Sequence, residues 1–167
     1  MKAISLVLLV ATLFVADVFA DTIHIISGTD GNGNALSFMG LDPLTEYISA
    51  STPTKSPAIA WINRPDPPQP LDLLGSPASQ TISSANNSDT WAEFYYEFTV
   101  PSQMSAPLLS LQLSVDDEAK VYLNGNQLGG IYTHNWNQEV YTIVEDNASL
   151  FNIGGTNVLK FHVINAN

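Results

Sequence analysis

The chain has 167 residues and few charges for its size, with 5 Lys+Arg against 16 Asp+Glu and a formal net charge of −11. So few basic side chains exclude a surface built to bind nucleic acid or anionic lipid, because both need clustered Lys and Arg. A hydrophobic fraction of 45% predicts a packed core and excludes a disordered acidic tail.

The first twenty residues have the pattern of a secretory signal peptide. The basic Lys2 precedes an apolar run over residues 4–16, and Ala20 offers a small residue before a cut. These features are typical of signal peptides, and the run is shorter than the roughly 20 apolar residues of a membrane-spanning helix. We expect cleavage after Ala20 to release residues 21–167 as a secreted, extracellular or cell-surface protein without membrane insertion. The net charge stays at −11, because cleavage removes one acidic and one basic residue.

Residues 21–167 are predicted to form a single domain without disulfides. The segment has the length of one domain with its own core, and the chain contains no cysteine. Its stability must therefore come from packing, hydrogen bonds or a metal ion.

Alternation of apolar and polar residues predicts an all-β domain. In the clearest run, residues 91–100, one face carries Phe94, Tyr96, Phe98 and Val100, and the other carries Glu93, Tyr95, Glu97 and Thr99. Trp91 at its start fits either a core or a surface role. Further strands are predicted at residues 22–26, 58–62, 109–115, 119–123, 139–144 and 158–164.

The connections between these strands complete the predicted fold. The acidic turn at residues 116–118 and the pair Asn124-Gly125, which favours the positive φ angles of a tight hairpin, are interpreted as structural. Prolines between residues 65 and 77 predict a surface crossover. About eight strands with one long connection predict a two-sheet antiparallel β-sandwich with jelly-roll topology.

Seven short motifs carry a family resemblance. In chain order they are Ser27-Gly28-Thr29-Asp30-Gly31-Asn32-Gly33-Asn34, Gly40-Leu41-Asp42-Pro43, Ala60-Trp61-Ile62, Phe98-Thr99-Val100-Pro101, Val115-Asp116-Asp117, Val121-Tyr122-Leu123-Asn124-Gly125 and Gly155-Thr156-Asn157-Val158-Leu159. The chain resembles, over nearly all of residues 21–167, the galactose-binding-domain-like jelly rolls of exported bacterial proteins. One departure is that residues 44–47 read Leu-Thr-Glu-Tyr where the resemblance implies a Trp. The family includes carbohydrate-binding modules, accessory domains of glycoside hydrolases, adhesion domains and structural modules, so the fold alone does not select a function.

The segment 131–138 is the candidate carbohydrate site. We expect the rings of Tyr132 and Trp136 to stack on a sugar, and His134 and Asn135 to form hydrogen bonds with its hydroxyl groups. The segment is predicted to be a polar loop, and loops often carry binding residues. In the alternative interpretation, one of the two aromatic residues only closes the end of the sandwich.

A second candidate site is a structural calcium site formed by Asp30, Asn32, Asn34 and Asp42. Oxygen side chains at alternate positions of a glycine-rich loop suit a hard cation, and the family resemblance implies calcium as well. The pattern lacks the central Gly and the final Glu of an EF-hand loop. An Asn/Gly turn without an ion remains the alternative.

No catalytic signature is found in the sequence, such as Gly-x-Ser-x-Gly, His-Glu-x-x-His or a glycine-rich phosphate loop. We therefore predict a secreted, non-catalytic carbohydrate-binding or adhesion-type protein whose partner is a glycan or a cell-surface polysaccharide. The alternative is self-assembly: a structural subunit of an extracellular filament or surface assembly, in which residues 22–26 pair with the sheet edge of a neighbouring subunit.

Overall fold

The computed structural model describes residues 5–15, 24–25, 36, 40–61, 81–83, 88–133 and 141–165. In this part of the chain none of the elements is a helix able to cross a membrane. In chain order the elements are β1 (Ser5–Val15), β2 (His24–Ile25), β3 (Leu41–Ser49), β4 (Ser56–Trp61), β5 (Thr81–Ser83), β6 (Trp91–Thr99), β7 (Pro107–Asp116), β8 (Glu118–Leu123), β9 (Asn126–Thr133), β10 (Tyr141–Glu145), the 3-10 helix η1 (Ala148–Leu150) and β11 (Thr156–Ile164).

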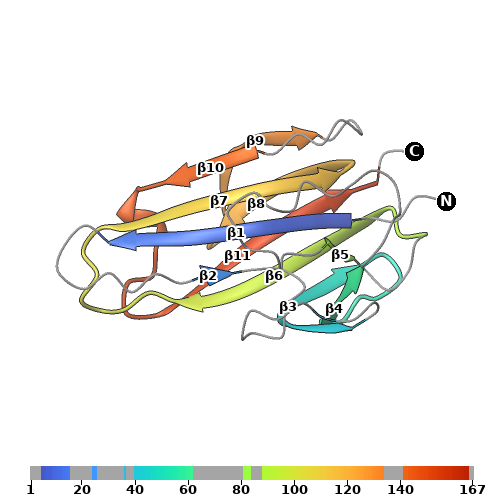
Figure 1. The fold of residues 1–167 in the computed structure, drawn as a ribbon, viewed down its shortest axis with the longest axis horizontal. Helices are drawn as coiled ribbons and strands as arrows, with labels where there is room; N and C mark the ends of the chain where they lie inside the picture. Colours follow the sequence, from blue (N-terminus) through green and yellow to red (C-terminus); the bar gives the residue numbers. More distant parts are fainter. Residues whose placement is uncertain are drawn as a thin grey trace.

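The strands pair antiparallel along one path, β10-β7-β1-β5-β4-β3-β6-β11-β8-β9, with β2 paired to β1. The path bends over itself, so that β7 contacts β8, β9 and β11 without pairing with them. We refer to β10, β7 and β1 as the front layer and to β3, β6, β11, β8 and β9 as the back layer (Figure 1). The predicted all-β, two-layer antiparallel sandwich is confirmed, and its jelly-roll connectivity stays a prediction.

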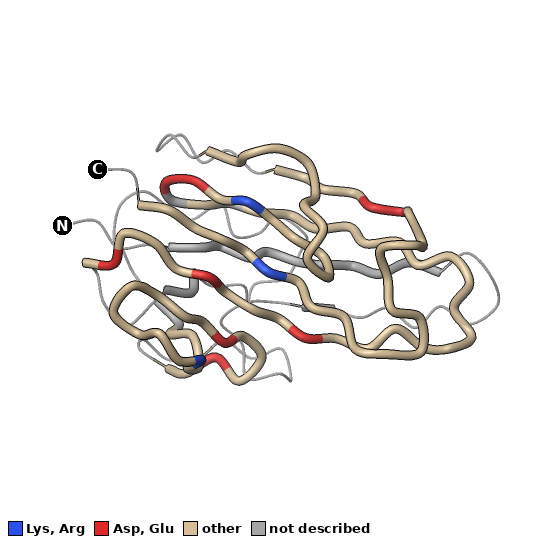
Figure 2. Tube along the Cα trace, turned by 180° about the vertical axis from the view of Figure 1, so that it is seen from behind, with Lys and Arg blue, Asp and Glu red and all other residues tan. Residues whose placement is uncertain are grey.

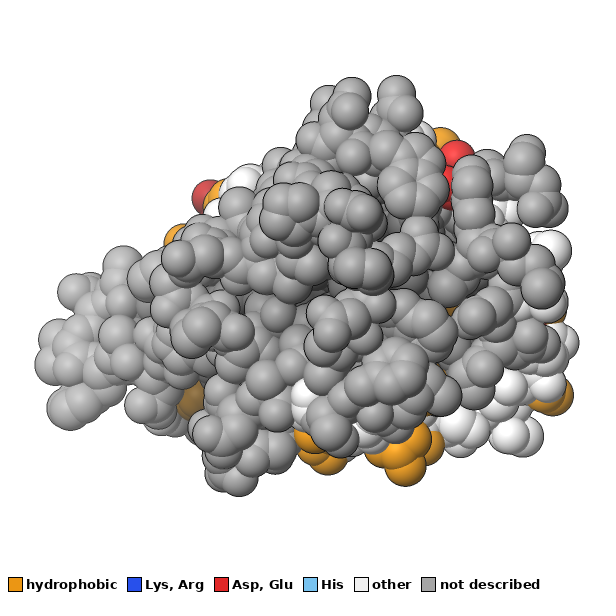
Figure 3. All heavy atoms as spheres, turned by 45° about the vertical axis from the view of Figure 1, so that its right-hand side comes forward, with side chains coloured by type: hydrophobic (Ala, Val, Ile, Leu, Met, Phe, Trp, Pro, Cys, Tyr) orange, Lys and Arg blue, Asp and Glu red, His pale blue; other side chains and the backbone are white. Residues whose placement is uncertain are grey.

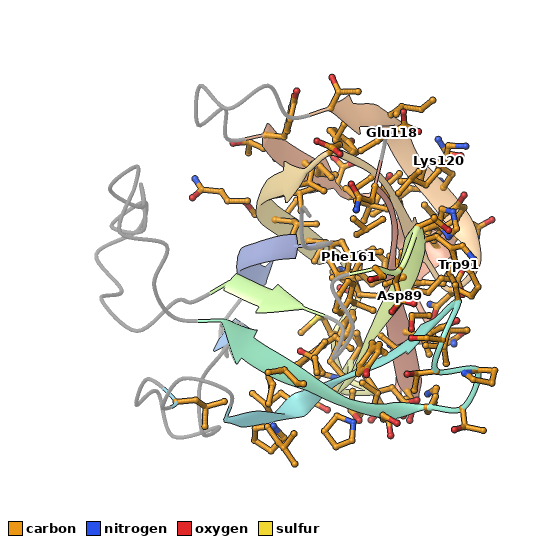
Figure 4. The ribbon with its side chains drawn as sticks, turned by 90° about the vertical axis from the view of Figure 1, so that its right-hand side faces the viewer. Asp89, Trp91, Glu118, Lys120 and Phe161 are labelled. Carbon is orange, nitrogen blue, oxygen red and sulfur yellow. The ribbon has the colours of Figure 1, made fainter. Side chains whose placement is uncertain are left out.

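The core lies between the two layers and follows the predicted alternation. In the end-on view of Figure 4, Phe161 points between the layers, whereas Trp91 and Lys120 lie on the outer side of the back layer. The buried side chains include Phe94, Tyr96 and Phe98 of β6, Leu109, Leu111 and Leu113 of β7, Val121 and Leu123 of β8, and Leu159, Phe161 and Val163 of β11. Because every second residue of these strands is buried, the residues between them are left on the outer faces.

Two asparagines fasten the β8–β9 hairpin to the start of β11. Asn124 and Gly125 have φ angles of 50° and 84°, which suit a two-residue hairpin turn. The Asn124 side chain donates to the carbonyl oxygen of Leu150 at 2.8 Å and to Oδ1 of Asn157 at 2.7 Å, and it accepts from the N–H of Val158 at 2.9 Å. The structural interpretation of this turn is confirmed.

Four strands are not predicted by the alternation of the sequence. In β3, Pro43 and an irregularity between Asp42 and Glu46 interrupt the pattern, and in β9 most residues are exposed on both faces. The prediction of a loop is wrong for residues 131–133, which belong to β9. The third, β5, has only three residues. The fourth, β1, lies within the predicted signal peptide, whose cleavage stays a prediction, and the proline-rich crossover lies outside the described residues.

Candidate functional site

The described basic side chains gather at the back layer. Lys120 and Lys160 come from β8 and β11, and Lys55 reaches Glu97 of β6 from the connection between β3 and β4. Figure 2 shows basic residues interspersed with acidic ones on this side. On the side seen in Figure 3, the described side chains in view are hydrophobic, uncharged or acidic. In a chain of net charge −11, the described Lys side chains are therefore found on the back layer.

The pairing of β6 with β11 brings a group of polar and aromatic residues together on the outer face. In this register Lys160 lies opposite Tyr95, and His162 lies opposite Glu93. Trp91 is the first residue of β6 and lies on the same face, because successive side chains of a strand alternate between faces. We refer to Trp91, Glu93, Tyr95, Lys160 and His162 as the outer-face cluster.

Glu93 is the centre of this cluster. Its Oε1 accepts a hydrogen bond from Nζ of Lys160 at 2.9 Å and lies 3.2 Å from Nδ1 of His162, and its Oε2 accepts from the hydroxyl of Tyr95. Burial alone raises the pKa of Glu93, but the hydrogen bonds from Tyr95 and Lys160 and the charges of Lys160 and His162 outweigh it and lower this pKa below its ordinary value. Glu93 is therefore a carboxylate, a hydrogen-bond acceptor, near neutral pH.

The aromatic residues beside Glu93 are held by cations. Burial, the hydrogen bond to Glu93 and its negative charge raise the pKa of Tyr95, so its hydroxyl keeps its proton. Nζ of Lys55 lies 4.9 Å from the centre of the Tyr95 ring, and Nζ of Lys160 lies 4.7 Å from the centre of the Tyr122 ring. Lys55, Tyr95, Lys160 and Tyr122 thus form a row in which cations and rings alternate, and each such contact is attractive.

A shallow groove, largely open to solvent, lies at one end of the cluster. Its volume of about 500 Å³ falls within the usual range for ligand sites. The rings of Trp91 and His162 are stacked there, with centroids 6.3 Å apart and planes 21° apart. The N–H of Asn165 donates to the carbonyl oxygen of Thr90 at 2.9 Å and ties the chain segments at the rim. The groove is lined by Thr90, Trp91, Glu93, His162, Ile164 and Asn165. It therefore combines apolar and aromatic surface with a carboxylate, an imidazole and neutral polar groups.

The carbohydrate site predicted from the sequence lies elsewhere and is described only in part. Tyr132 belongs to β9, is half-buried against the core, and donates from its hydroxyl to the carbonyl oxygen of Leu128 at 3.2 Å. Its ring meets that of Tyr141 edge-on at 5.1 Å, and burial raises its pKa. His134, Asn135 and Trp136 lie outside the described residues, so the grouping of these four side chains stays a prediction.

The predicted calcium site is also described only in part. Asp42 lies in β3 with an exposed fraction of 1%, and its Oδ1 accepts the backbone N–H groups of Leu44 at 2.8 Å and Thr45 at 3.1 Å. Asp30, Asn32 and Asn34 fall outside the described residues. Within the described residues, no three His, Asp or Glu side chains are grouped to hold a metal ion. The calcium ion stays a prediction.

Sequence reasoning placed Glu93 and Tyr95 on one face of a strand but did not join them to Lys160 and His162. Lys160 and His162 lie 67 and 69 positions from Glu93 in the chain, and the register of the two strands is not visible in either pattern. A usable signal was present, because each strand carries a charged residue next to an aromatic or imidazole ring on its polar face. Matching the acidic polar face of one strand with the basic polar face of the other would have predicted this cluster.

No protein-family model, curated protein or solved structure matches the chain. The resemblance to galactose-binding-like domains therefore stays a prediction, and the function has to be argued from the chain's own surface. What is established for this chain is an all-β, two-layer antiparallel sandwich with a groove beside a charged and aromatic cluster on its back layer.

Proposed function

We propose that the protein is a secreted, non-catalytic carbohydrate-binding protein that holds a glycan in the groove beside the outer-face cluster. The observation that carries the proposal is the position of the stacked Trp91 and His162 rings next to the ionised carboxylate of Glu93. A sugar presents C–H groups on its faces and hydroxyl groups around its edge. Trp91 suits the first, and Glu93 suits the second as an acceptor.

The groove is organised without a ligand. Lys160 and Tyr95 hold the carboxylate of Glu93 from two sides, and Lys160 is itself placed over Tyr122. Such fixed polar groups lower the entropy cost of binding. The support for a carbohydrate is therefore both chemical and geometric.

Glu93 is better suited to binding than to hydrolysis. A glycosidase needs a carboxylic acid whose pKa is raised, so that it can protonate the leaving group. The pKa of Glu93 is lowered instead. Neutral or amino-sugar glycans are favoured as ligands over acidic polysaccharides, because a net charge of −11 repels polyanions.

A glycan array probed with the exported chain tests the proposal. Trp91→Ala removes the stacking surface of the groove, and Trp136→Ala, on the segment predicted from the sequence, is the matched comparison. Loss of a buried aromatic contact at the centre of a site costs about 2 kcal/mol or more, so we expect Trp91→Ala to weaken binding by well over about tenfold. Trp91→Phe keeps an aromatic face and should retain part of the affinity.

Each result of this comparison is decisive. Saturable binding that is lost in Trp91→Ala and kept in Trp136→Ala supports the groove. Binding that is lost in Trp136→Ala and kept in Trp91→Ala places the site in the segment 131–138 and contradicts the proposal that the groove binds the glycan. An array on which the folded, unmodified protein binds nothing at high concentration overturns carbohydrate binding itself.

A further inference from the structure

β1 fills a place in the front layer that export would empty. It pairs antiparallel with β7 from Ser5↔Asp116 to Val15↔Pro107. The other edge of β1 contacts β5 at Ser5 and Leu6 and β2 at Ala11 and Thr12. Figure 1 shows β1 between β7 and β2. We refer to the place beside β7 that β1 occupies as the strand slot.

The residues of β1 are the apolar run of the predicted signal peptide. Their removal leaves the N–H and C=O groups on one edge of β7 unpaired over Pro107–Asp116, while β10 covers only Leu109 to Leu113 on the other edge. Leu109, Leu111 and Leu113 of β7 are buried core residues. A long unpaired edge next to the core is a strong template for another strand.

We propose that in the mature protein the strand slot is filled by the N-terminal strand of a second copy of this chain. The proposal rests on the export that is part of the proposed function. The donor is the segment 22–26, Thr-Ile-His-Ile-Ile, which follows the cleavage site and is rich in β-branched residues. Part of it, β2, is already a strand paired with β1.

The direction of β2 argues for a second copy rather than the chain's own segment. β1 runs antiparallel to β7 and also antiparallel to β2, so β2 and β7 run in the same direction. If β2 moved sideways into the empty slot, it would lie parallel to β7, although every named strand pair of the described residues is antiparallel. An N-terminal arm that enters from another molecule restores the antiparallel pairing.

This exchange joins subunits head-to-tail, because the donor segment and the strand slot are different surfaces of the same subunit. Successive contacts of this kind build an open filament, or a ring where the rotation between subunits closes. The net charge of −11 per subunit opposes close approach. Because salt screens this repulsion, the assemblies should grow with ionic strength.

The absence of cysteine from the chain allows a direct test. The intact mass of the exported protein first reports whether residues 1–20 have been removed. Copies carrying His24→Cys are then mixed, under oxidising conditions, with copies carrying Ser110→Cys on the outward side of β7. Cysteine placed two residues before or after His24 tests the other registers in which the donor strand could pair with β7. Thr99→Cys, an exposed position on β6 of the back layer, replaces Ser110→Cys as the matched control.

A disulfide that joins the two kinds of copy through Ser110→Cys, and not through Thr99→Cys, supports the proposal. Deletion of residues 21–27 should then leave monomers. A chain carrying both cysteines that cross-links only within itself overturns the proposal, because its own N-terminal strand then closes the slot. A cleaved chain without either cross-link overturns it as well. If the exported protein retains residues 1–20, the proposed strand exchange is overturned, because the strand slot is never emptied. Glycan binding is measured separately, so failure of the strand exchange can be told apart from failure of the proposed carbohydrate site.

Discussion

Asn157 is the side chain on which the joint between β11 and the β8–β9 hairpin depends. It is fully buried, and its amide takes part in four hydrogen bonds, with Asn124, Gly155 and twice with the backbone of Asn152. Each such bond contributes a net free energy of about 1 kcal/mol. Asn152 is exposed, so water can replace the two bonds of its backbone in an Asn157→Ala variant. We expect this variant to lose about 2–3 kcal/mol of unfolding free energy, or about 5–10 °C in Tm.

Equilibrium unfolding in urea, followed by tryptophan fluorescence, measures this loss. The control is Asn126→Ala, an exposed residue of the same hairpin whose amide makes only two long contacts of 3.4 Å to carbonyl oxygens. The control should lose about 0.5 kcal/mol or less. A loss below about 1 kcal/mol for Asn157→Ala would refute the reasoning, since the buried amide would then not hold the joint.

Lys160→Met removes a hydrogen bond and a positive charge from Glu93, so we expect the lowered pKa of Glu93 to rise. The Glu93 carboxylate stabilises the fold above the ordinary Glu pKa, and this contribution is lost as the pH falls through the pKa of the folded state. In the variant the loss therefore occurs at a higher pH. Tm values measured over a range of pH check this, with Lys55→Met as the control. If Tm of Lys160→Met falls at the same acidic pH as Tm of the unmodified protein, the prediction is contradicted. Gly129→Ala, with φ at +65°, incurs the left-handed backbone cost of about 1–2 kcal/mol and also places a Cβ against the hydroxyl of Tyr132, whereas Gly125→Ala, with φ at +84°, meets open space. Urea unfolding should show the larger loss for Gly129→Ala, and equal losses would argue against the contact. If Asp30, Asn32, Asn34 and Asp42 bind calcium, a chelator should lower Tm. An unchanged Tm would contradict the predicted calcium site.

The strands that the sequence predicts well are those with one buried face. In β6, β8 and β11 the buried and outward positions alternate without interruption, so the pattern reveals both the strand and its orientation. The pattern fails in β9, where Gly129 and Gly130 accompany a register shift and both faces are largely exposed. It also fails in β3, where Asp42 turns its side chain back to the following backbone N–H groups and breaks the alternation.

The candidate groove depends on information that single strands do not carry. The outward positions of Glu93 and His162 follow from alternation, but their contact depends on the register between β6 and β11. That register depends on which residues of the two strands are buried together in the core, which is a tertiary effect. The sequence therefore predicts a binding site at the aromatic residues of the segment 131–138, whereas Trp91 at a strand start fits a core or a surface role equally well.

The most direct test of carbohydrate binding in the groove uses the three tryptophans of the chain as separate reporters. Each indole N–H gives its own signal in a proton–nitrogen NMR spectrum, and the Trp91→Phe, Trp61→Phe and Trp136→Phe variants assign them. On titration with the best glycan from the array, we expect the Trp91 signal to shift in a saturable way while the other two stay in place. A saturable shift of the Trp136 signal with an unmoved Trp91 signal would contradict it.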